Sequence, residues 1–250
     1  MNLAGKVAVI TGAGGGIGVG FARRFAAEGA RVVLGDISEQ VLAVASEVGG
    51  VGRVGDMTIE ADVQALYALA EQTHGRIDIW FSNAGIATPR RPARIPADDE
   101  WDRMWRLHVM AHVFASRAVL PTMLERGDGY LIQTVSRVAL GAHPGKAAYS
   151  VTKHASLALG EWLAIQFRPR GVKVSCFCPG AMQTPMLLAN LQSDDDPRYA
   201  SALTPEAVAD ILVRGMEAEK FLITTPDAGT APLEARVADW DAWLGSLNPA

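Results

Sequence analysis

The sequence predicts a doubly wound α/β fold, a single domain in which helices cover both faces of a seven-stranded parallel sheet. Short apolar runs rich in Val, Ile and Leu alternate with longer amphipathic stretches, and this alternation is typical of parallel strands joined by crossover helices. Several runs carry apolar residues consecutively, as strands that are buried on both faces require. With 250 residues, of which 49% are hydrophobic and 20% charged, the chain is long enough to bury one large core.

The expected strands and helices follow one another in order along the chain. The apolar runs predict strands at 6–10, 31–35, 52–55, 78–81, 130–135, 172–177 and 221–224. The amphipathic stretches between them predict helices near 17–28, 39–48, 60–74, 98–126, 150–168 and 206–218. A short amphipathic helix that carries Trp240 and Trp243 is expected in the C-terminal tail, 226–250.

Local signals support two of the helix starts. Thr204, Pro205 and Glu206 occur in the order of an N-cap, a first-turn proline and a first-turn acid. The acids at 98–100 place negative charge at the start of the long helix, where the helix dipole favours it.

Two segments, 87–97 and 186–204, are expected to be irregular. Each follows a strand, and loops at the carboxyl ends of strands line the ligand crevice of an open α/β sheet. Both are therefore candidate substrate loops, and 186–204 is the candidate lid. Three arginines of the first segment, Arg90, Arg91 and Arg94, are interpreted as a solvated cluster, with contact to a carboxylate or phosphate as the alternative.

Composition argues against several classes of protein. The net charge is −4 and no run of Lys or Arg occurs, so no nucleic-acid partner is expected. No apolar stretch approaches the roughly 18 residues of a membrane span, and the N-terminus turns to glycine where a signal peptide would stay apolar. Cys176 and Cys178 stand two apart in an expected strand, a poor disulfide geometry. We therefore expect a cytoplasmic protein that acts on a small molecule away from membranes.

A glycine-rich turn follows the first expected strand and leads directly into a helix. Residues 11–18 read TGAGGGIG. Glycine permits positive φ and lets the backbone approach a pyrophosphate, which the N-terminus of the helix then faces. The candidate phosphate-binding residues are Gly12, Gly14, Gly15, Gly16, Ile17 and Gly18.

The second expected strand ends at Asp36. An acid at this position can accept hydrogen bonds from both hydroxyl groups of an adenosine ribose and would repel a 2′-phosphate. Ile37 follows it, and no Lys or Arg stands at 13–15. The pattern predicts NAD rather than NADP as the cofactor. A helix-capping role for Asp36 or Ser38 is compatible with this interpretation.

Ser136, Tyr149 and Lys153 are the candidate catalytic residues. Tyr149 and Lys153 are four residues apart and so share one face of a helix. A free phenol has a pKa of about 10, and a nearby ammonium is expected to lower that pKa and make Tyr149 a usable proton donor and acceptor. Ser136, at the end of the fifth strand, can hold a substrate oxygen against Tyr149.

With these residues the chain resembles a short-chain dehydrogenase/reductase from residue 5 to about 225. The resemblance implies a Rossmann fold, with Tyr149 as general acid/base, Lys153 on the nicotinamide ribose and Ser136 orienting the substrate. It also implies cofactor contacts by Asp56 and Met57 at the adenine, by Asn83, Ala84 and Gly85 beneath the nicotinamide ribose, and by Pro179, Gly180, Met182 and Thr184 at the carboxamide. It further implies that Tyr149 and Lys153 contact the cofactor.

The chain departs from the family pattern at His108, where an asparagine that holds a relay water is usual. Our hypothesis is that His108 takes that place, either by holding the water or by passing the proton, and a packed helix residue is the alternative. His108 and His112 form an i,i+4 pair, but no third ligand stands nearby in sequence, so no metal site is predicted. The C-terminal segment also differs from the family pattern, which leaves a homodimer or a homotetramer open.

The resemblance and the residues together imply reversible hydride transfer between NAD and a secondary alcohol or ketone. The expected substrate contacts are Ser136, Val138, His143, Tyr149 and Met186, and the apolar members favour a hydrophobic, cyclic or aryl substrate. A regulatory protein that binds NAD(H) without turnover is the alternative from another class. A lyase or epimerase would need a larger C-terminal domain than this chain has.

Overall fold

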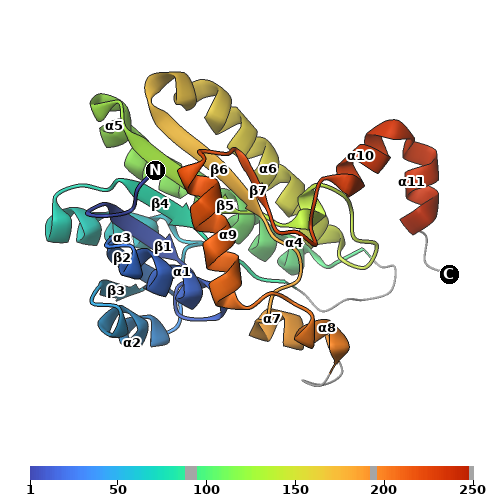
Figure 1. Ribbon diagram of the computed structural model, residues 1–250, viewed down its shortest axis with the longest axis horizontal. Helices are drawn as coiled ribbons and strands as arrows, with labels where there is room; N and C mark the ends of the chain where they lie inside the picture. The colour runs from blue at the N-terminus through green and yellow to red at the C-terminus, as the bar shows by residue number, and fades with distance from the viewer. Residues whose placement is uncertain (88–94, 192–195, 248–250) are drawn as a thin grey trace.

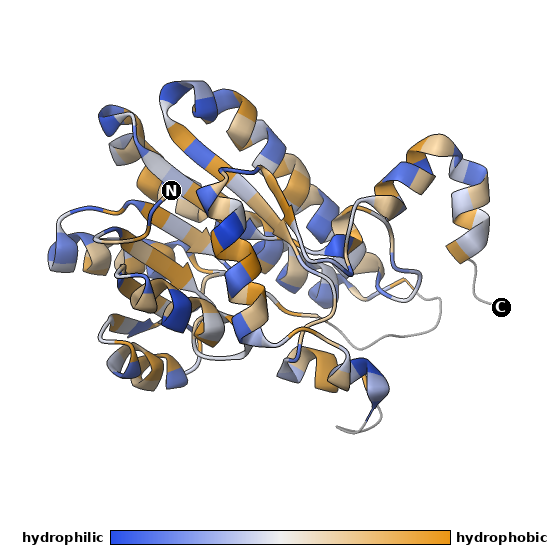
Figure 2. Cartoon of the chain, viewed as in Figure 1, coloured by the Kyte–Doolittle hydropathy of each residue, from blue (hydrophilic) through white to orange (hydrophobic). Residues whose placement is uncertain are grey.

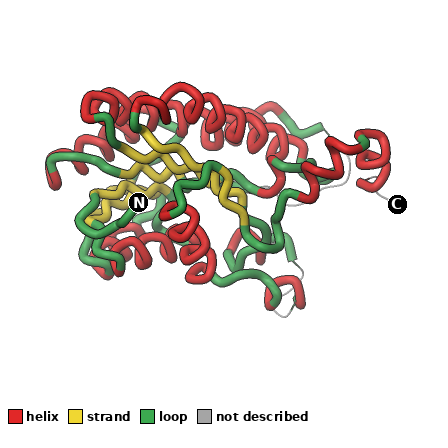
Figure 3. The backbone as a smooth tube through the Cα atoms, turned by 45° about the horizontal axis from the view of Figure 1, so that its top comes forward, coloured by secondary structure: helices red, strands yellow, loops and turns green. Residues whose placement is uncertain are grey.

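The computed structural model describes residues 1–87, 95–191 and 196–247. A seven-stranded sheet with the strand order β3-β2-β1-β4-β5-β6-β7 lies between two layers of helices (Figures 1 and 3). All neighbouring strands run parallel. The order reverses between β1 and β4, which places a ligand crevice at the carboxyl ends of these two strands. The predicted doubly wound sheet is confirmed.

The strands and helices begin and end within a few residues of their predicted limits. The strands are β1 Val7–Thr11, β2 Arg31–Asp36, β3 Val51–Val54, β4 Ile79–Ser82, β5 Gly129–Thr134, β6 Val172–Cys178 and β7 Leu222–Thr224. The helices are α1 Gly16–Ala27, α2 Gln40–Glu47, α3 Glu60–His74, α4 Asp98–Trp105, α5 Ala111–Arg126, α6 Ala147–Phe167, α7 Pro185–Leu188, α8 Pro197–Ala200, α9 Pro205–Glu217, α10 Ala231–Ala238 and α11 Trp240–Leu247.

The consecutive apolar residues of the strands serve two cores at once. In β4, Phe81 packs with Phe21 and Phe177 in the core beneath α1 and α9, while its neighbour Trp80 lies in the core beneath α3, α5 and α6. Successive side chains of a strand point to opposite faces, so both faces here must be apolar. Figure 2 shows the hydrophobic strands inside and the hydrophilic helix residues outside.

The helix predicted at 98–126 is interrupted. A π-helical turn, Arg106–Met110, joins α4 to α5 with His108 at its centre. A π turn inserts one residue without ending the helix, so the sequence pattern gives no sign of it. The hydroxyl of Ser156 on α6 donates to the carbonyl oxygen of His108 at 2.5 Å. The irregular turn therefore lies directly against the helix that carries Tyr149 and Lys153.

The segment 186–204 is more regular than predicted. Its described residues include most of α7 and all of α8. The side chains of the N-cap residues Thr184 and Asp196 each accept a backbone N–H at the start of their own helix. The sequence pattern missed both because each is only four residues long. Arg90, Arg91 and Arg94 lie outside the described residues.

The C-terminal tail holds two helices instead of one. Figure 1 shows α10 and α11 beyond the end of the sheet, past α4. Arg236 of α10 donates to His154 Nε2 on α6 at 3.2 Å, and Trp243 of α11 is 8% exposed. By length and composition the helix Asp98–Arg126 could cross a membrane, but 56% of its most apolar window is buried inside the fold, as expected for a helix that packs against a sheet.

Candidate active site

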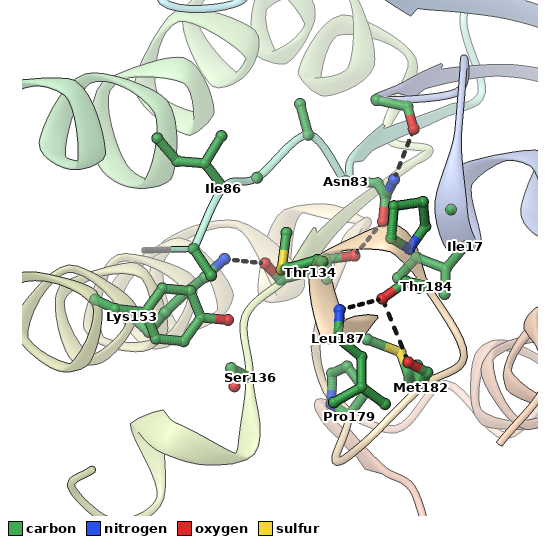
Figure 4. A pocket seen from close by; sticks show the side chains of 18 of the residues that line it. Ile17, Asn83, Ile86, Thr134, Ser136, Lys153, Pro179, Met182, Thr184 and Leu187 are labelled. Carbon is green, nitrogen blue, oxygen red and sulfur yellow. Dashed lines mark hydrogen bonds between the residues drawn. The ribbon is translucent and has the colours of Figure 1, made fainter. Parts of the chain in front are cut away.

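A cleft of about 840 Å³ opens at the carboxyl ends of the strands. The segments after β1, β2, β3, β4, β5 and β6 line it together with the first turns of α6 and α7. Figure 4 shows the cleft from close by, with Lys153 and Ser136 on one side of the view, Thr134 in the middle, and Asn83, Thr184 and Met182 on the other side.

The glycine-rich turn packs directly on the segment after β4. Gly12 has φ +67°, and a Cβ there would lie 2.7 Å from the Cα of Ala84. Gly16 also has positive φ, whereas Gly15 is extended and a Cβ there would meet nothing within 4 Å. The close backbone approach explains why glycine is required at Gly12. Gly15, the N-cap of α1, has no side chain to cap the first N–H groups of that helix.

Asp36, the last residue of β2, lies beside the glycine-rich turn. Its Oδ2 accepts from the backbone N of Gly14 at 2.8 Å and its Oδ1 from the backbone N of Ser38 at 2.8 Å. Ser38 Oγ accepts from the backbone N of Gln40, the first residue of α2, so Ser38 rather than Asp36 supports the start of that helix. The carboxylate is thus fixed in place while it lines the cleft beside Ile37.

Asn83 ties together three strands at the floor of the cleft. Its side-chain N donates to the carbonyl oxygen of Thr11 at 3.1 Å. Its side-chain O accepts from Thr134 Oγ1 at 2.9 Å (Figure 4). Its backbone N donates to Thr11 Oγ1 at 3.0 Å. Asn83 therefore joins the ends of β1, β4 and β5.

Ser136, Tyr149 and Lys153 meet at the edge of the cleft. Lys153 Nζ donates to the carbonyl oxygen of Thr134 at 2.9 Å and lies 5.8 Å from the centre of the Tyr149 ring. Burial lowers the pKa of Lys153 to about 8. Ser136 lines the cleft just after β5, and its Oγ accepts from the backbone N of Val138 at 3.2 Å.

The expected lowering of the Tyr149 pKa does not occur in this structure. Burial raises the pKa of Tyr149, and a hydrogen bond with Ser136 opposes that rise without overcoming it. The reason is geometric, because the Lys153 ammonium donates to Thr134 rather than to the phenol. Burial of a phenol favours its neutral form, and sequence spacing carries no information about burial.

His108 is fully buried beneath the cleft and is held at both ring nitrogens. Nε2 accepts from the backbone N of Ile86 at 3.2 Å, and Nδ1 lies 3.0 Å from Thr152 Oγ1. The Thr152 hydroxyl donates to the carbonyl oxygen of Ala148 at 2.8 Å, so it accepts from His108 and the proton of the ring is on Nδ1. Burial and the charge of Lys153 hold the pKa of His108 well below its usual range. The ring is therefore neutral.

His112, one turn further on, is buried and neutral as well. Burial lowers its pKa to about 3. Within the described residues, neither of its ring nitrogens has a hydrogen-bond partner, and no group of three His, Cys, Asp or Glu residues gathers as a metal site.

The segment after β6 forms hydrogen bonds with the segment after β7. Gly180 N donates to Thr225 Oγ1 at 2.8 Å and Ala181 N donates to Asp227 Oδ2 at 2.9 Å. Thr184 Oγ1 donates to the carbonyl oxygen of Met182 at 3.3 Å and accepts from Leu187 N at 3.2 Å (Figure 4). Residues 180–184 thus form a fixed wall of the cleft.

Most of the predicted site residues line this one cleft. Gly14, Gly18 and His108 do not, because Gly14 and Gly18 are buried within the turn and His108 is buried beneath the floor of the cleft. The predicted substrate residues that line it are Ser136, Val138, His143, Tyr149 and Met186. Sequence reasoning missed Thr134 and Thr152, whose partners come from distant segments, and Lys146, whose position three residues before Tyr149 was the available signal.

Comparison with known proteins adds independent findings. A family model described as short chain dehydrogenase matches residues 6–195. Oxidoreductase UcpA of Salmonella typhimurium is 39% identical over 218 residues, which cover 83% of this chain and 81% of that protein. The D-beta-hydroxybutyrate dehydrogenase of Rhizobium meliloti is 30% identical over 234 residues, 90% of each chain. A crystal structure of a short chain dehydrogenase/reductase from Burkholderia phymatum in complex with NAD is 26% identical with a TM-score of 0.86 and covers 100% of this chain and 98% of that one.

Proposed function

The chain belongs to the short-chain dehydrogenase family, and we propose that it is an NAD(H)-dependent oxidoreductase that interconverts a secondary alcohol and a ketone. The observation that carries the proposal is the convergence of Ser136, Tyr149 and Lys153 at the edge of a cleft whose far end holds Asp36. A relative named for dehydrogenation of hydroxybutyrate and a structural neighbour that binds NAD support it.

The residues of the cleft fit NAD. The glycine turn offers an uncapped N-terminus of α1 to a pyrophosphate. Both oxygens of Asp36 are fixed at the cleft, where they suit the two hydroxyl groups of a ribose. The described lining residues around Asp36, namely Ile37 and those at 55–58, include no Lys or Arg that would favour a 2′-phosphate. When bound, the nicotinamide supplies the hydride acceptor or donor.

The side chains handle the substrate oxygen and its proton. In oxidation, Tyr149 as phenolate removes the hydroxyl proton while the carbinol carbon gives up a hydride, and the alcohol becomes a ketone. Ser136 holds the substrate oxygen against Tyr149. Lys153, with a pKa of about 8, is charged at neutral pH. For this charge to favour the phenolate, the ammonium must turn from the carbonyl oxygen of Thr134 toward the phenol. In reduction, Tyr149 returns the proton.

We propose that His108 positions the residues of the active site. It links Ile86, at the floor of the cleft, to Thr152 of the catalytic helix. A role in passing protons remains the competing hypothesis, and the pH dependence of turnover distinguishes the two.

We retain the cytoplasm as the expected compartment and a homodimer or homotetramer as the expected assembly.

The test of the proposed function is NADH formation from NAD⁺ with a panel of aliphatic, cyclic and aryl secondary alcohols. We expect turnover in the wild-type protein, loss of at least about a hundredfold in Tyr149→Phe, and little activity with NADP⁺. NADH binding should survive in Tyr149→Phe, which separates lost chemistry from lost folding. Tight NADH binding without turnover on any substrate would favour the regulatory alternative, and activity with NADP⁺ alone would contradict the role of Asp36.

A further inference from the structure

The helices α10 and α11 pack behind one wall of the cleft. That wall is the segment 136–146, several of whose residues line the cleft. A Cβ at Gly141 would lie 3.0 Å from Pro232 Cβ on α10 and 3.8 Å from Trp243 Cζ2 on α11. Leu233 packs against a buried cluster that includes two residues of the same segment. Two helices that lie beyond the end of the sheet (Figure 1) therefore support the wall next to the catalytic residues.

Arg236 of α10 lies between two indole rings and the catalytic helix. Its guanidinium carbon is 5.1 Å from the ring centre of Trp240 and 5.7 Å from that of Trp243. Its Nη1 lies 3.2 Å from His154 Nε2. His154 Nδ1 lies 2.8 Å from the carbonyl oxygen of Ser150, which can only accept, so Nδ1 carries the ring proton and Nε2 accepts from Arg236.

This hydrogen bond joins the C-terminal helices to the helix that carries the catalytic residues. His154 directly follows Lys153 and lies five residues after Tyr149 on α6. Among the described residues, it is the only hydrogen bond between α10 or α11 and another helix or strand, and Arg236 forms no ion pair with a carboxylate there. The guanidinium is therefore the polar link between α6 and the helices that support the wall.

We infer that Arg236 is a positioning residue, which holds the segment 136–146 in place against α6 so that Ser136 faces the same substrate oxygen as Tyr149. The inference rests on the proposed function and names a further residue that supports the same site. Without the guanidinium, α10 and α11 lose their polar link to α6, and the wall that they support shifts relative to Tyr149. A small shift of this kind misaligns a bound substrate.

The cofactor end of the cleft should be unaffected. The segment after β6 is held by Thr225 and Asp227, which precede α10. The glycine-rich turn follows β1, which β4 and β5 separate from β6. Loss of Arg236 should therefore weaken the positioning of the substrate and leave NADH binding nearly unchanged, whereas a general loss of stability would weaken both. This difference separates a positioning role from a purely structural one.

The first experiment compares Arg236→Met with Arg236→Lys in the full-length protein, using the secondary alcohol that the wild-type protein oxidises fastest. Met keeps much of the apolar side chain but cannot donate to His154. We expect KM for the alcohol to rise roughly fivefold or more and kcat to fall in Arg236→Met, while the Kd of NADH stays within about twofold of the wild-type value. Arg236→Lys, which keeps a charged donor, should restore most of the loss. Arg214→Met removes an exposed arginine of α9 that does not line the cleft, and this matched control should change neither constant.

Hydrogen exchange followed by mass spectrometry gives a readout that does not depend on turnover. In Arg236→Met the backbone amides of 137–146 should exchange faster than in the wild-type protein, whereas those of 12–18 should not change. His154→Phe, which removes the acceptor, should reproduce this pattern. The double variant should be no worse than either single variant, because both substitutions break the same contact.

Unchanged exchange at 137–146 in Arg236→Met would overturn the role of Arg236. Equal weakening of alcohol and NADH binding would overturn it as well, because a purely structural role predicts that result. A wild-type protein that binds NADH but oxidises no alcohol would contradict the proposed function instead, and the exchange at 137–146 would still decide whether Arg236 holds this wall of the cleft.

Discussion

His108 connects two parts of the site that lie far apart in the sequence. Its Nε2 accepts from Ile86 after β4, and its Nδ1 donates to Thr152, which lies one residue before Lys153. Because the pKa of His108 is held well below its usual value, the ring stays neutral at the pH values where dehydrogenation is measured. To carry a proton, the ring would have to release one of these two partners. Its hydrogen bonds therefore favour a positioning role.

Replacement of His108 by alanine should impair the enzyme without moving its pH profile. Two buried hydrogen bonds and the packing of the ring are lost, so we expect a decrease of about 2–4 kcal/mol in the free energy of unfolding and roughly a tenfold lower kcat/KM. Thr152→Val removes the hydroxyl that accepts from Nδ1 and donates to the carbonyl oxygen of Ala148 but keeps the ring, so it should have a smaller effect in the same direction. The measurements are urea unfolding and kcat/KM as a function of pH.

The pH profile decides between the two roles of His108. If His108 passes the proton, the inflection in kcat/KM moves in His108→Ala and stays in place in Thr152→Val, whose ring is retained. An inflection that is unchanged in both variants, with kcat/KM lowered, agrees with positioning.

The sequence predicted those parts of the candidate site whose residues lie close together in the chain. Tyr149 and Lys153 share a helix, so their four-residue spacing is sufficient to bring them together. Thr134 accepts from Lys153 only because the end of β5 lies beside α6, a contact across 19 positions of the sequence. The pKa of Tyr149 was predicted in the wrong direction, since the desolvation that raises it depends on the whole surrounding fold.

In the turn between β1 and α1, substitution of glycine should destabilise the protein at Gly12 but not at Gly15. A Cβ at Gly12 would lie 2.7 Å from Ala84 Cα and 2.9 Å from Ala84 N, and the φ of +67° is unfavourable for any other residue. Gly12→Ala should therefore lower the free energy of unfolding by about 2 kcal/mol or more, from backbone strain and displacement of the Ala84 segment. The measurement is denaturant unfolding without cofactor.

Gly15→Ala is the matched control within the same turn. The backbone of Gly15 is extended and a Cβ there meets nothing within 4 Å. We expect its free energy of unfolding to stay within about 0.5 kcal/mol of the wild-type value. Equal destabilisation by the two substitutions would show that the contact with Ala84 does not determine the requirement for glycine at Gly12.

Elements differ in how well their sequences define them. The N-cap of α9 is read directly from Thr204 and Pro205, and Thr204 Oγ1 accepts from Ala207 N at 3.2 Å as that pattern predicts. The π turn Arg106–Met110 could not be predicted, because its residues remain helical and only the hydrogen-bond spacing changes.

At the scale of the whole molecule, the fold class followed from strands that are apolar on both faces, as in β4 and β5. The position of α10 and α11 could not be predicted from the sequence pattern. Their placement depends on isolated contacts such as Arg236 with His154, between residues 82 positions apart. No periodic pattern encodes such a contact.

The outer face of α6 carries a stripe of exposed apolar side chains. Val151, Trp162 and Ile165 are 49%, 53% and 70% exposed, and their spacing places them on one side of the helix. Such a stripe on a surface helix is typical of a subunit interface. We therefore expect a dimer in solution that buries this face.

Ile165→Glu should dissociate that dimer. Each of the two copies would bury an unpaired carboxylate, so the dissociation constant should rise by roughly a hundredfold or more. Because Ile165 is 70% exposed within one chain, the monomer should remain folded. Light scattering over a range of concentrations gives the mass, and circular dichroism checks the fold. Gln40→Glu adds the same charge to the exposed side of α2 and should leave the mass unchanged. A wild-type protein that stays monomeric at every concentration, or an Ile165→Glu variant that remains fully dimeric, would place the interface elsewhere than α6.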